Sequence, residues 1–133
     1  MQTECAGNTA AKMIKLISLI PRKPGLTRQQ FIDHYEAVHA PLALSLFPQI
    51  ARYVRNYPTG DDNMHYAGKI DCPGLPYDAV TEQWFSDRAA YDAMMRSFAS
   101  DPARFKDLSE DEDRFIDKGR MIMFLVEERD SAL

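Results

Sequence analysis

The 133-residue sequence has few of the groups on which covalent, metal or phosphate chemistry usually rests. It contains two cysteines, Cys5 and Cys72, and three histidines, and none of these residues shows the Cys/His spacing of a zinc site. We therefore expect free thiols, a reducing compartment and no metal centre. A glycine-rich phosphate loop and a nucleophile elbow are also missing, so we expect no cofactor.

Long apolar runs and concentrated positive charge are missing as well. The first dozen residues are polar, which argues against a signal peptide, and no stretch approaches the roughly 20 apolar residues of a membrane span. The formal net charge is −4 and the lysines and arginines are scattered, whereas nucleic-acid binding depends on clustered basic charge. We expect a cytoplasmic protein that has neither a membrane nor a nucleic acid as its partner.

The length fits a single domain at residues 12–130, preceded by a disordered tail at residues 1–11. Apolar, β-branched and aromatic content predicts four strands, at residues 13–20, 50–57, 79–85 and 121–126. The last is apolar on both faces, as in a central strand that is covered on both sides. Helical patterns occupy residues 27–39, the segment from Ser86 or Asp87 through Phe98, and more weakly residues 101–115. This β-α-β-β-α-β order predicts an α+β, ferredoxin-like fold.

The first helix is the best specified element. Thr27 and Gln30 form a capping-box pattern, and an apolar stripe follows on one face, with His39 at its edge: Phe31, Tyr35, Val38 and Leu42. Pro41 disfavours helical geometry before it, so we expect the helix to end or kink near His39, with a short helical continuation. A helix C-terminus raises the pKa of an imidazole and burial lowers it, which leaves the direction for His39 open.

A four-stranded sheet in this order has helices on one face only, so its other face needs a cover. That face would carry Trp84 and half of the residues at 121–126. Packing against a second copy of the chain is the simplest solution, and we expect a homodimer.

The connection at residues 58–78 is far longer than an ordinary hairpin loop. It is rich in glycine and proline and carries groups capable of chemistry: His65, Tyr66, Cys72 and Tyr77. We expect it to form a lid over a pocket.

The pattern Phe31-x-x-x-Tyr35-x-x-x-His39-Ala40-Pro41-Leu42, together with the segments 52–56 and 111–117, resembles the EthD family of dimeric α+β barrel proteins from about residue 13 to residue 128. Segments 53–66 and 78–85 are similar to bacterial methylmuconolactone isomerases, which are cofactor-free acid–base enzymes. The resemblance implies a pocket between the sheet and its helices, with histidines at the positions of His39 and His65. The resemblance also implies that the strand face that carries Gln83 points toward that pocket, although the isomerases carry a cysteine at this position.

The candidate catalytic residues are two imidazoles and a phenol: His39, His65 and Tyr53. The candidate substrate-binding residues share strand faces or the helix stripe with them: Tyr35, Arg55, Tyr57, Gln83 and Phe85. The structural alternatives are a core histidine at position 39, an exposed histidine at position 65 and packing roles for the tyrosines. We expect His34 to meet solvent or a carboxylate, and the acidic run at residues 110–113 to form a solvated face.

Two imidazoles and several phenols around an apolar cavity favour proton transfer on a small hydrophobic substrate, which could be aromatic, polyketide-like or a lactone. One histidine would remove a proton beside a carbonyl, the other would protonate an oxygen, and a tyrosine would hold the enolate. The sequence therefore predicts a lyase or isomerase that performs dehydration, cyclisation or isomerisation. The alternatives are a cofactor-free monooxygenase of a phenolic substrate and a non-catalytic dimeric ligand-binding or accessory protein of a degradation pathway.

Overall fold

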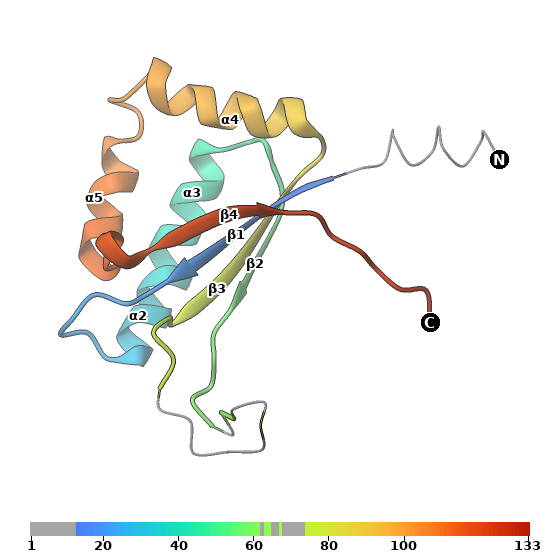
Figure 1. Ribbon diagram of the computed structural model, residues 1–133. Coiled ribbons are helices and arrows are strands. Elements are labelled where there is room, and N and C mark those ends of the chain that lie inside the picture. Colours follow the sequence, from blue (N-terminus) through green and yellow to red (C-terminus); the bar gives the residue numbers. More distant parts are fainter. Residues whose placement is uncertain (1–12, 62, 65–66, 68–73) are drawn as a thin grey trace.

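The computed structural model describes residues 13–61, 63–64, 67 and 74–133 of the chain (Figure 1). The predicted tail at residues 1–11 and the two cysteines lie outside the described residues. His65 and Tyr66, which belong to the predicted lid, also lie outside them.

Four strands form one antiparallel sheet in the order β2-β3-β1-β4. Their bounds are close to the predicted ones: β1 (Ile14–Ile20), β2 (Ile50–Asn56), β3 (Ala79–Phe85) and β4 (Ile122–Val126). Each helical crossover skips one position in the sheet, and the strand of the other β-α-β unit fills that position. The ferredoxin-like α+β prediction is confirmed.

The helices gather on one side of the sheet (Figure 1). They are α2 (Arg28–His34), α3 (Ala40–Leu46), α4 (Arg88–Ser100) and α5 (Lys106–Phe115). Within the described residues, no helix is long and apolar enough to cross a membrane.

The predicted capping box starts α2. The backbone N–H of Gln30 donates to Thr27 Oγ1 over 3.1 Å, and the N–H of Thr27 donates to Gln30 Oε1 over 2.9 Å. Of the two predicted caps for α4, Asp87 is the one used, since its carboxylate accepts from the N–H of Ala90 at 2.8 Å. Both helix starts are therefore encoded locally.

The expected end or kink near His39 is instead a π-helical turn over Tyr35–His39, after which α3 continues through Pro41. This turn is closed by the N–H of Ala40 donating to the carbonyl of Tyr35, five residues back. The extra residue in the turn brings His39 into line with Tyr35, and both side chains are buried. Val38, predicted to lie in the apolar stripe, is rotated outward and is 44% exposed.

β4 lies at an edge of the sheet and not in its centre, so the prediction of a central, doubly covered strand is wrong. Its apolar side chains Ile122, Met123, Phe124 and Leu125 are between 37% and 52% exposed in the single chain. An apolar strand with an unpaired edge demands a cover that this chain does not supply within the described residues.

The helix-free face of the sheet is divided into a polar half and an apolar half. Trp84 lies on this face as predicted, but it is 7% exposed because Lys15 and Arg52 stand 4.5 Å from its ring centroid. Its indole N–H donates to Glu128, which also pairs with Lys15. The exposed apolar half lies over β4, not at Trp84.

Two clusters of buried side chains form the core on the helix side. One is built around Phe47, Phe85 and Phe105, and the other around Phe31, Tyr35 and Phe115. Tyr53 of β2 packs against both clusters. The space between the sheet and the helices, where the two clusters meet, holds the candidate site.

Candidate active site

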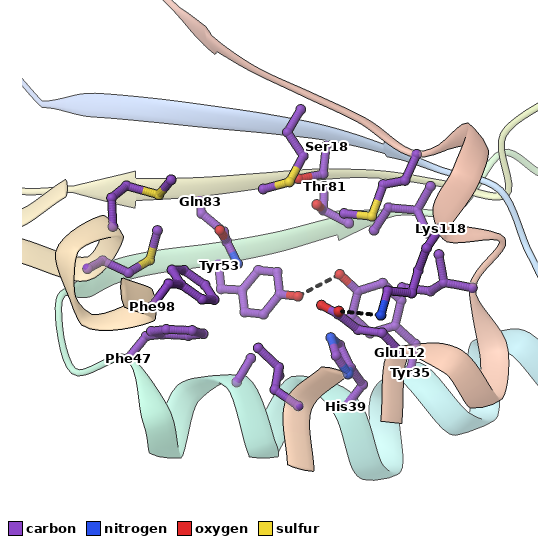
Figure 2. Close-up of a pocket in the computed structure, with 18 residues that line it drawn as sticks. Ser18, Tyr35, His39, Phe47, Tyr53, Thr81, Gln83, Phe98, Glu112 and Lys118 are labelled. Carbon is purple, nitrogen blue, oxygen red and sulfur yellow. Dashed lines mark hydrogen bonds and ion pairs between the residues drawn. The ribbon is translucent and has the colours of Figure 1, made fainter. Parts of the chain in front are cut away.

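A cavity of about 450 Å³ lies between the helices and the helix-facing side of the sheet (Figure 2). Its wall is mainly apolar and includes Phe47, Phe98 and four methionines, at positions 94, 95, 121 and 123. The polar side chains that line it come from strands and helices alike: Ser18, Tyr35, His39, Tyr53, Thr81, Gln83, Glu112 and Lys118. Such a mixture, in which few polar groups converge on an apolar hollow, is typical of small-molecule sites.

His39 forms a hydrogen-bonded pair with Asp111 of α5. Its Nδ1 lies 3.0 Å from Asp111 Oδ2, and the two side chains are 7% and 2% exposed. A carboxylate accepts only, so Nδ1 carries the proton and donates it to this bond. The second ring nitrogen, Nε2, is then an unprotonated acceptor, and the ring reaches into the cavity (Figure 2).

Asp111 is held by further donors. Its Oδ1 lies 2.8 Å from His34 Nε2 and accepts from Arg114 Nη1 at 3.3 Å. His34 thus meets a carboxylate, one of the two environments expected for it. The prediction that residues 110–113 form a solvated face is wrong for Asp111, which is 1% exposed.

The acidic neighbours of Asp111 hide the buried carboxylate in the composition of the sequence, and only its place in the helical repeat indicates it. Asp111 lies three residues after Leu108 and four before Phe115, and all three are the buried residues of α5. This spacing was the signal that distinguishes Asp111 from Glu110 and Asp113, which lie on the exposed side.

Opposing effects set the charge state of the pair. Burial lowers the pKa of His39, the hydrogen bond to Asp111 raises it, and the net direction is downward from the ordinary value of 6.5. Burial raises the pKa of Asp111, but hydrogen bonds from His34 and His39 outweigh it and lower the pKa of this carboxyl. The pair is therefore a neutral imidazole on a carboxylate at neutral pH, which is the state of a general base.

Two phenols meet in the same cavity. The hydroxyls of Tyr35 and Tyr53 are 2.5 Å apart (Figure 2). Burial raises the pKa of Tyr53 to about 12, although its hydrogen bond to Tyr35 acts in the opposite direction, and burial also raises the pKa of Tyr35 well above 10.0. Both phenols are neutral at neutral pH, so one O–H joins the two rings and the other can donate to a ligand oxygen.

Arg55 of β2 and Tyr57, the residue after this strand, were predicted to share a face with Tyr53, but they do not line the cavity. Arg55 donates to both carboxylate oxygens of Glu36, at 2.6 and 3.0 Å, and the Tyr57 hydroxyl donates to the same carboxylate. The Arg55 guanidinium stands 4.7 Å from the centroid of the Tyr53 ring. This network fixes the position of Tyr53 from outside the cavity.

On β3, strand alternation directs Thr81 and Gln83 into the cavity, as predicted for Gln83. Phe85 shares their face but is fully buried in the core, where it packs edge-on against Tyr91 at 5.4 Å between centroids. It supports the cavity wall without lining it. His65, the second predicted catalytic histidine, lies outside the described residues.

Glu112 and Lys118 were not predicted as site residues, yet both line the cavity. Lys118 Nζ lies 3.8 Å from Glu112 Oε1 (Figure 2). Burial raises the pKa of Glu112, and the charge of Lys118 opposes this effect only in part. No group of three or more His, Cys, Asp or Glu side chains among the described residues is arranged to hold a metal ion.

Solved structures of other proteins share this fold. An ethyl tert-butyl ether D (EthD) family protein from Bacillus halodurans C-125 is 21% identical over 89% of this chain and 100% of its own, with a TM-score of 0.60. A dimeric protein of unknown function and ferredoxin-like fold from Bacteroides fragilis NCTC 9343 is 10% identical over 87% of this chain and 96% of its own, with a TM-score of 0.54. SnoaB, a cofactor-independent oxygenase from Streptomyces nogalater, is 11% identical over 91% of this chain and 97% of its own, with a TM-score of 0.51.

None of the curated proteins matches this sequence. The model of the EthD domain family matches residues 23–119, which include both members of the His39–Asp111 pair. The chain belongs to the EthD family.

Proposed function

We propose that this protein is a cofactor-independent acid–base enzyme, a lyase or isomerase that acts on a small hydrophobic carbonyl compound. The observation that carries the proposal is the buried His39–Asp111 pair, whose free imidazole nitrogen opens onto an apolar cavity next to two neutral phenols. Enolate formation requires a base that removes a proton from the ligand and a hydrogen-bond donor that contacts the oxygen of the same ligand.

In the proposed step, His39 Nε2 removes a proton from the carbon beside a carbonyl. Asp111 holds the ring and stabilises the imidazolium that forms, as in other carboxylate–histidine pairs. The electron pair moves to the carbonyl oxygen, where the Tyr35–Tyr53 pair donates a hydrogen bond to the enolate. Each of these contributions is typically worth about 10²–10⁴ in rate, and all of them come from the protein's own side chains.

The shape and lining of the cavity support a small, mostly apolar substrate. Its volume of about 450 Å³ suits a compound of one to three fused rings, such as an aromatic, polyketide-like or lactone molecule. Phe47, Phe98 and the methionines offer ring faces and polarisable sulfurs to such a compound.

We also propose that the chain works as a homodimer. The exposed apolar side chains of β4 support this, because isolated subunits rarely leave such a row uncovered. The Bacteroides fragilis protein of the same fold is dimeric, which adds to the support.

A cofactor-free oxygenase is the second candidate, favoured by the likeness to SnoaB. Its first step would be the same removal of a proton by His39, after which dioxygen would react with the substrate anion. Dioxygen consumption in an oxygen electrode separates the two candidates, because a lyase or isomerase consumes none.

Hydrogen–deuterium exchange tests the base. α-Tetralone, a bicyclic ketone, is incubated with the protein in deuterium oxide, and loss of its C–H signal beside the carbonyl is followed by NMR. We expect His39→Gln and Asp111→Asn to lose about 10²–10⁴ in exchange rate, the first because glutamine cannot carry the proton and the second because the ring loses its orientation and charge partner.

Thermal unfolding of both variants is the control. A purely structural histidine predicts a stability loss of about 1–3 kcal/mol, with activity that falls only in proportion to the folded fraction. Wild-type exchange no faster than that of His39→Gln would contradict the proposed function.

A further inference from the structure

We propose that Glu112 is the catalytic acid of this cavity, and that it delivers a proton to the leaving oxygen of a β-hydroxy ketone while His39 removes the proton from carbon. This inference rests on the acid–base function proposed above. It assigns a dehydration and names the substrate class, a neutral aromatic ketone with a hydroxyl on the second carbon from the carbonyl.

The helix geometry gives Asp111 and Glu112 different tasks. Consecutive residues on a helix point about 100° apart, so Asp111 faces His34 and His39 while Glu112 turns into the cavity. His39 and Glu112 both reach toward the tyrosine hydroxyls from the helix side (Figure 2). One cavity thus receives a base from the π-turn and a carboxyl from α5, which packs against that turn, and removal of water requires both groups.

The pairing of Glu112 with Lys118 is loose. Lys118 Nζ is 3.8 Å from Glu112, but it is 3.1 Å from Asp113 Oδ1 and 3.0 Å from Ser109 Oγ. Its charge is therefore shared with partners on the exposed side of α5. The groups that bear on Glu112 are Lys118, which lowers its pKa, and Asp113 and Asp111, which act with burial to raise it. A carboxyl of this kind keeps its proton at a higher pH than an exposed one.

Glu112 also has a route to solvent. A second, open hollow on the outer side of α4 and α5 shares Phe98, Leu108, Glu112 and Lys118 with the cavity wall. The carboxyl thus stands between the cavity and a surface that water reaches. After giving up its proton, it can regain one from the outside while product still occupies the cavity.

The C–H bond beside the carbonyl breaks, and its proton moves to Nε2 of His39. The electron pair forms the new C=C bond, the C–O bond breaks, and the departing oxygen takes the proton of Glu112 and leaves as water. With the β-hydroxy derivative of α-tetralone, the product enone tautomerises to α-naphthol, whose fluorescence reports the reaction.

Two probes separate the roles of the two residues. α-Tetralone lacks the leaving hydroxyl and reports the base alone, whereas its β-hydroxy derivative needs base and acid. We expect Glu112→Gln to lose about 10²–10⁴ in naphthol formation and a much smaller factor in exchange with α-tetralone, so that the ratio of the two rates falls. The matched control is Glu110→Gln, the same change at a carboxylate of α5 that pairs with Lys106 and does not line the cavity, and we expect it to leave both rates at the wild-type level.

The pH profile adds a readout that a structural role would not move. The base must be neutral and the acid protonated, so the dehydration rate falls on both sides of an optimum. Glu112→Gln removes the alkaline limb and keeps the acidic limb. Lys118→Met, which retains Glu112, shifts the alkaline limb to higher pH because the charge that lowers the pKa of Glu112 is gone.

Dehydration by Glu112→Gln at the wild-type rate, or an alkaline limb unmoved in Lys118→Met, overturns the assignment of Glu112 and leaves the proposed function standing. Failure of the wild-type protein to exchange α-tetralone overturns the proposed function itself, and the assignment of Glu112 with it.

Discussion

Burial and the Asp111 carboxylate act in opposite directions on the pKa of His39, and the larger effect decides whether the imidazole can act as a base. If the charge of Asp111 dominated, the imidazole would stay protonated and the pair would be a buried ion pair without a basic nitrogen. Burial dominates instead and lowers the pKa of His39 below 6.5. The carboxylate shares its two oxygens among His34, His39 and Arg114, which weakens its hold on any one of them. The ring is then oriented by Asp111 and remains free to accept a proton.

This balance predicts how stability depends on pH. The unfolded chain carries His39 at about its ordinary pKa, whereas the folded chain resists its protonation, so between the two values the unfolded state binds more protons. Acidification from about pH 7.5, through the unfolded pKa and on to below the folded pKa, should therefore lower the free energy of unfolding, in all by about 1.4 kcal/mol for each unit of pKa depression. Urea unfolding across this range measures it.

The control is His39→Gln, in which that part of the slope disappears because no group titrates at position 39. The carboxyl of Asp111 adds nothing in this window, since its pKa is lowered from 3.8 and its contribution is lost only at more acidic pH. If the free energy of unfolding depended on pH equally in the two proteins, the pKa of the His39 imidazole would not be lowered by folding.

The position of a side chain relative to the cavity could be predicted from sequence where the pattern of its own helix or strand, or the family resemblance, indicates the face on which it lies. Tyr35, His39 and Tyr53 were predicted from a helix stripe and strand alternation, Gln83 was predicted from the family resemblance, and all four line the cavity. Asp111 and Glu112 were missed because the run at residues 110–113 is uniformly acidic in composition. The spacing of Asp111 from Leu108 and Phe115 indicates that this carboxylate is buried, but its partners His34 and His39 lie more than 70 positions away in sequence.

At the scale of elements, the π-turn is the feature that builds the site. Pro41 has no N–H to donate to the helix. The turn before it is wider than an α-helical turn, and in it the N–H of Ala40 donates to the carbonyl of Tyr35. Sequence alone predicted a disturbance at this place but not its form. A regular α-helix would set His39 at the edge of the Tyr35 face, and the π-turn moves it into the middle. Such turns often accompany functional sites for this reason.

The rotation has a direct test in Val38→Lys. A regular helix places Val38 in the buried stripe, where replacement by lysine would lower the free energy of unfolding by about 1.5–3 kcal/mol because the buried apolar surface is lost. The π-turn leaves this side chain 44% exposed, so we expect a change of less than about 0.5 kcal/mol in unfolding free energy, with α-tetralone exchange intact. Chemical denaturation decides between the two. Tyr35→Ala, at a position that is buried in either geometry, should cost several times more.

At the scale of the whole molecule, the fold followed from periodicity and connection lengths, because the β-α-β-β-α-β order allows few arrangements of a sheet. The distribution of exposed surface did not follow. Trp84 was expected to mark the uncovered face, yet Lys15, Arg52 and Glu128 cover its ring and its N–H. These partners come from two neighbouring strands and from beyond β4, and no local pattern links them to Trp84.

The uncovered apolar surface lies beside β4. In the register of the sheet, Ile122 lies opposite Leu19 and Phe124 opposite Ile17, so these four side chains share the helix-free face. The proposed dimer buries this group against the same group of a second copy, around a twofold axis. Each large side chain removed from water contributes about 1.5–3 kcal/mol before the cost of association.

Phe124→Lys should therefore dissociate the dimer. Lysine at this position places a like charge from each copy close to the shared face, where neither charge has a partner and both lose water. Light scattering at micromolar concentration should give the mass of one chain for this variant and of two chains for the wild type. Leu44→Lys is the matched control, because Leu44 is a comparably exposed apolar residue on α3, on the helix side, and its loss leaves the dimer intact. A wild-type protein that stays monomeric and soluble would refute the dimer, since the exposed row on β4 would then need no cover.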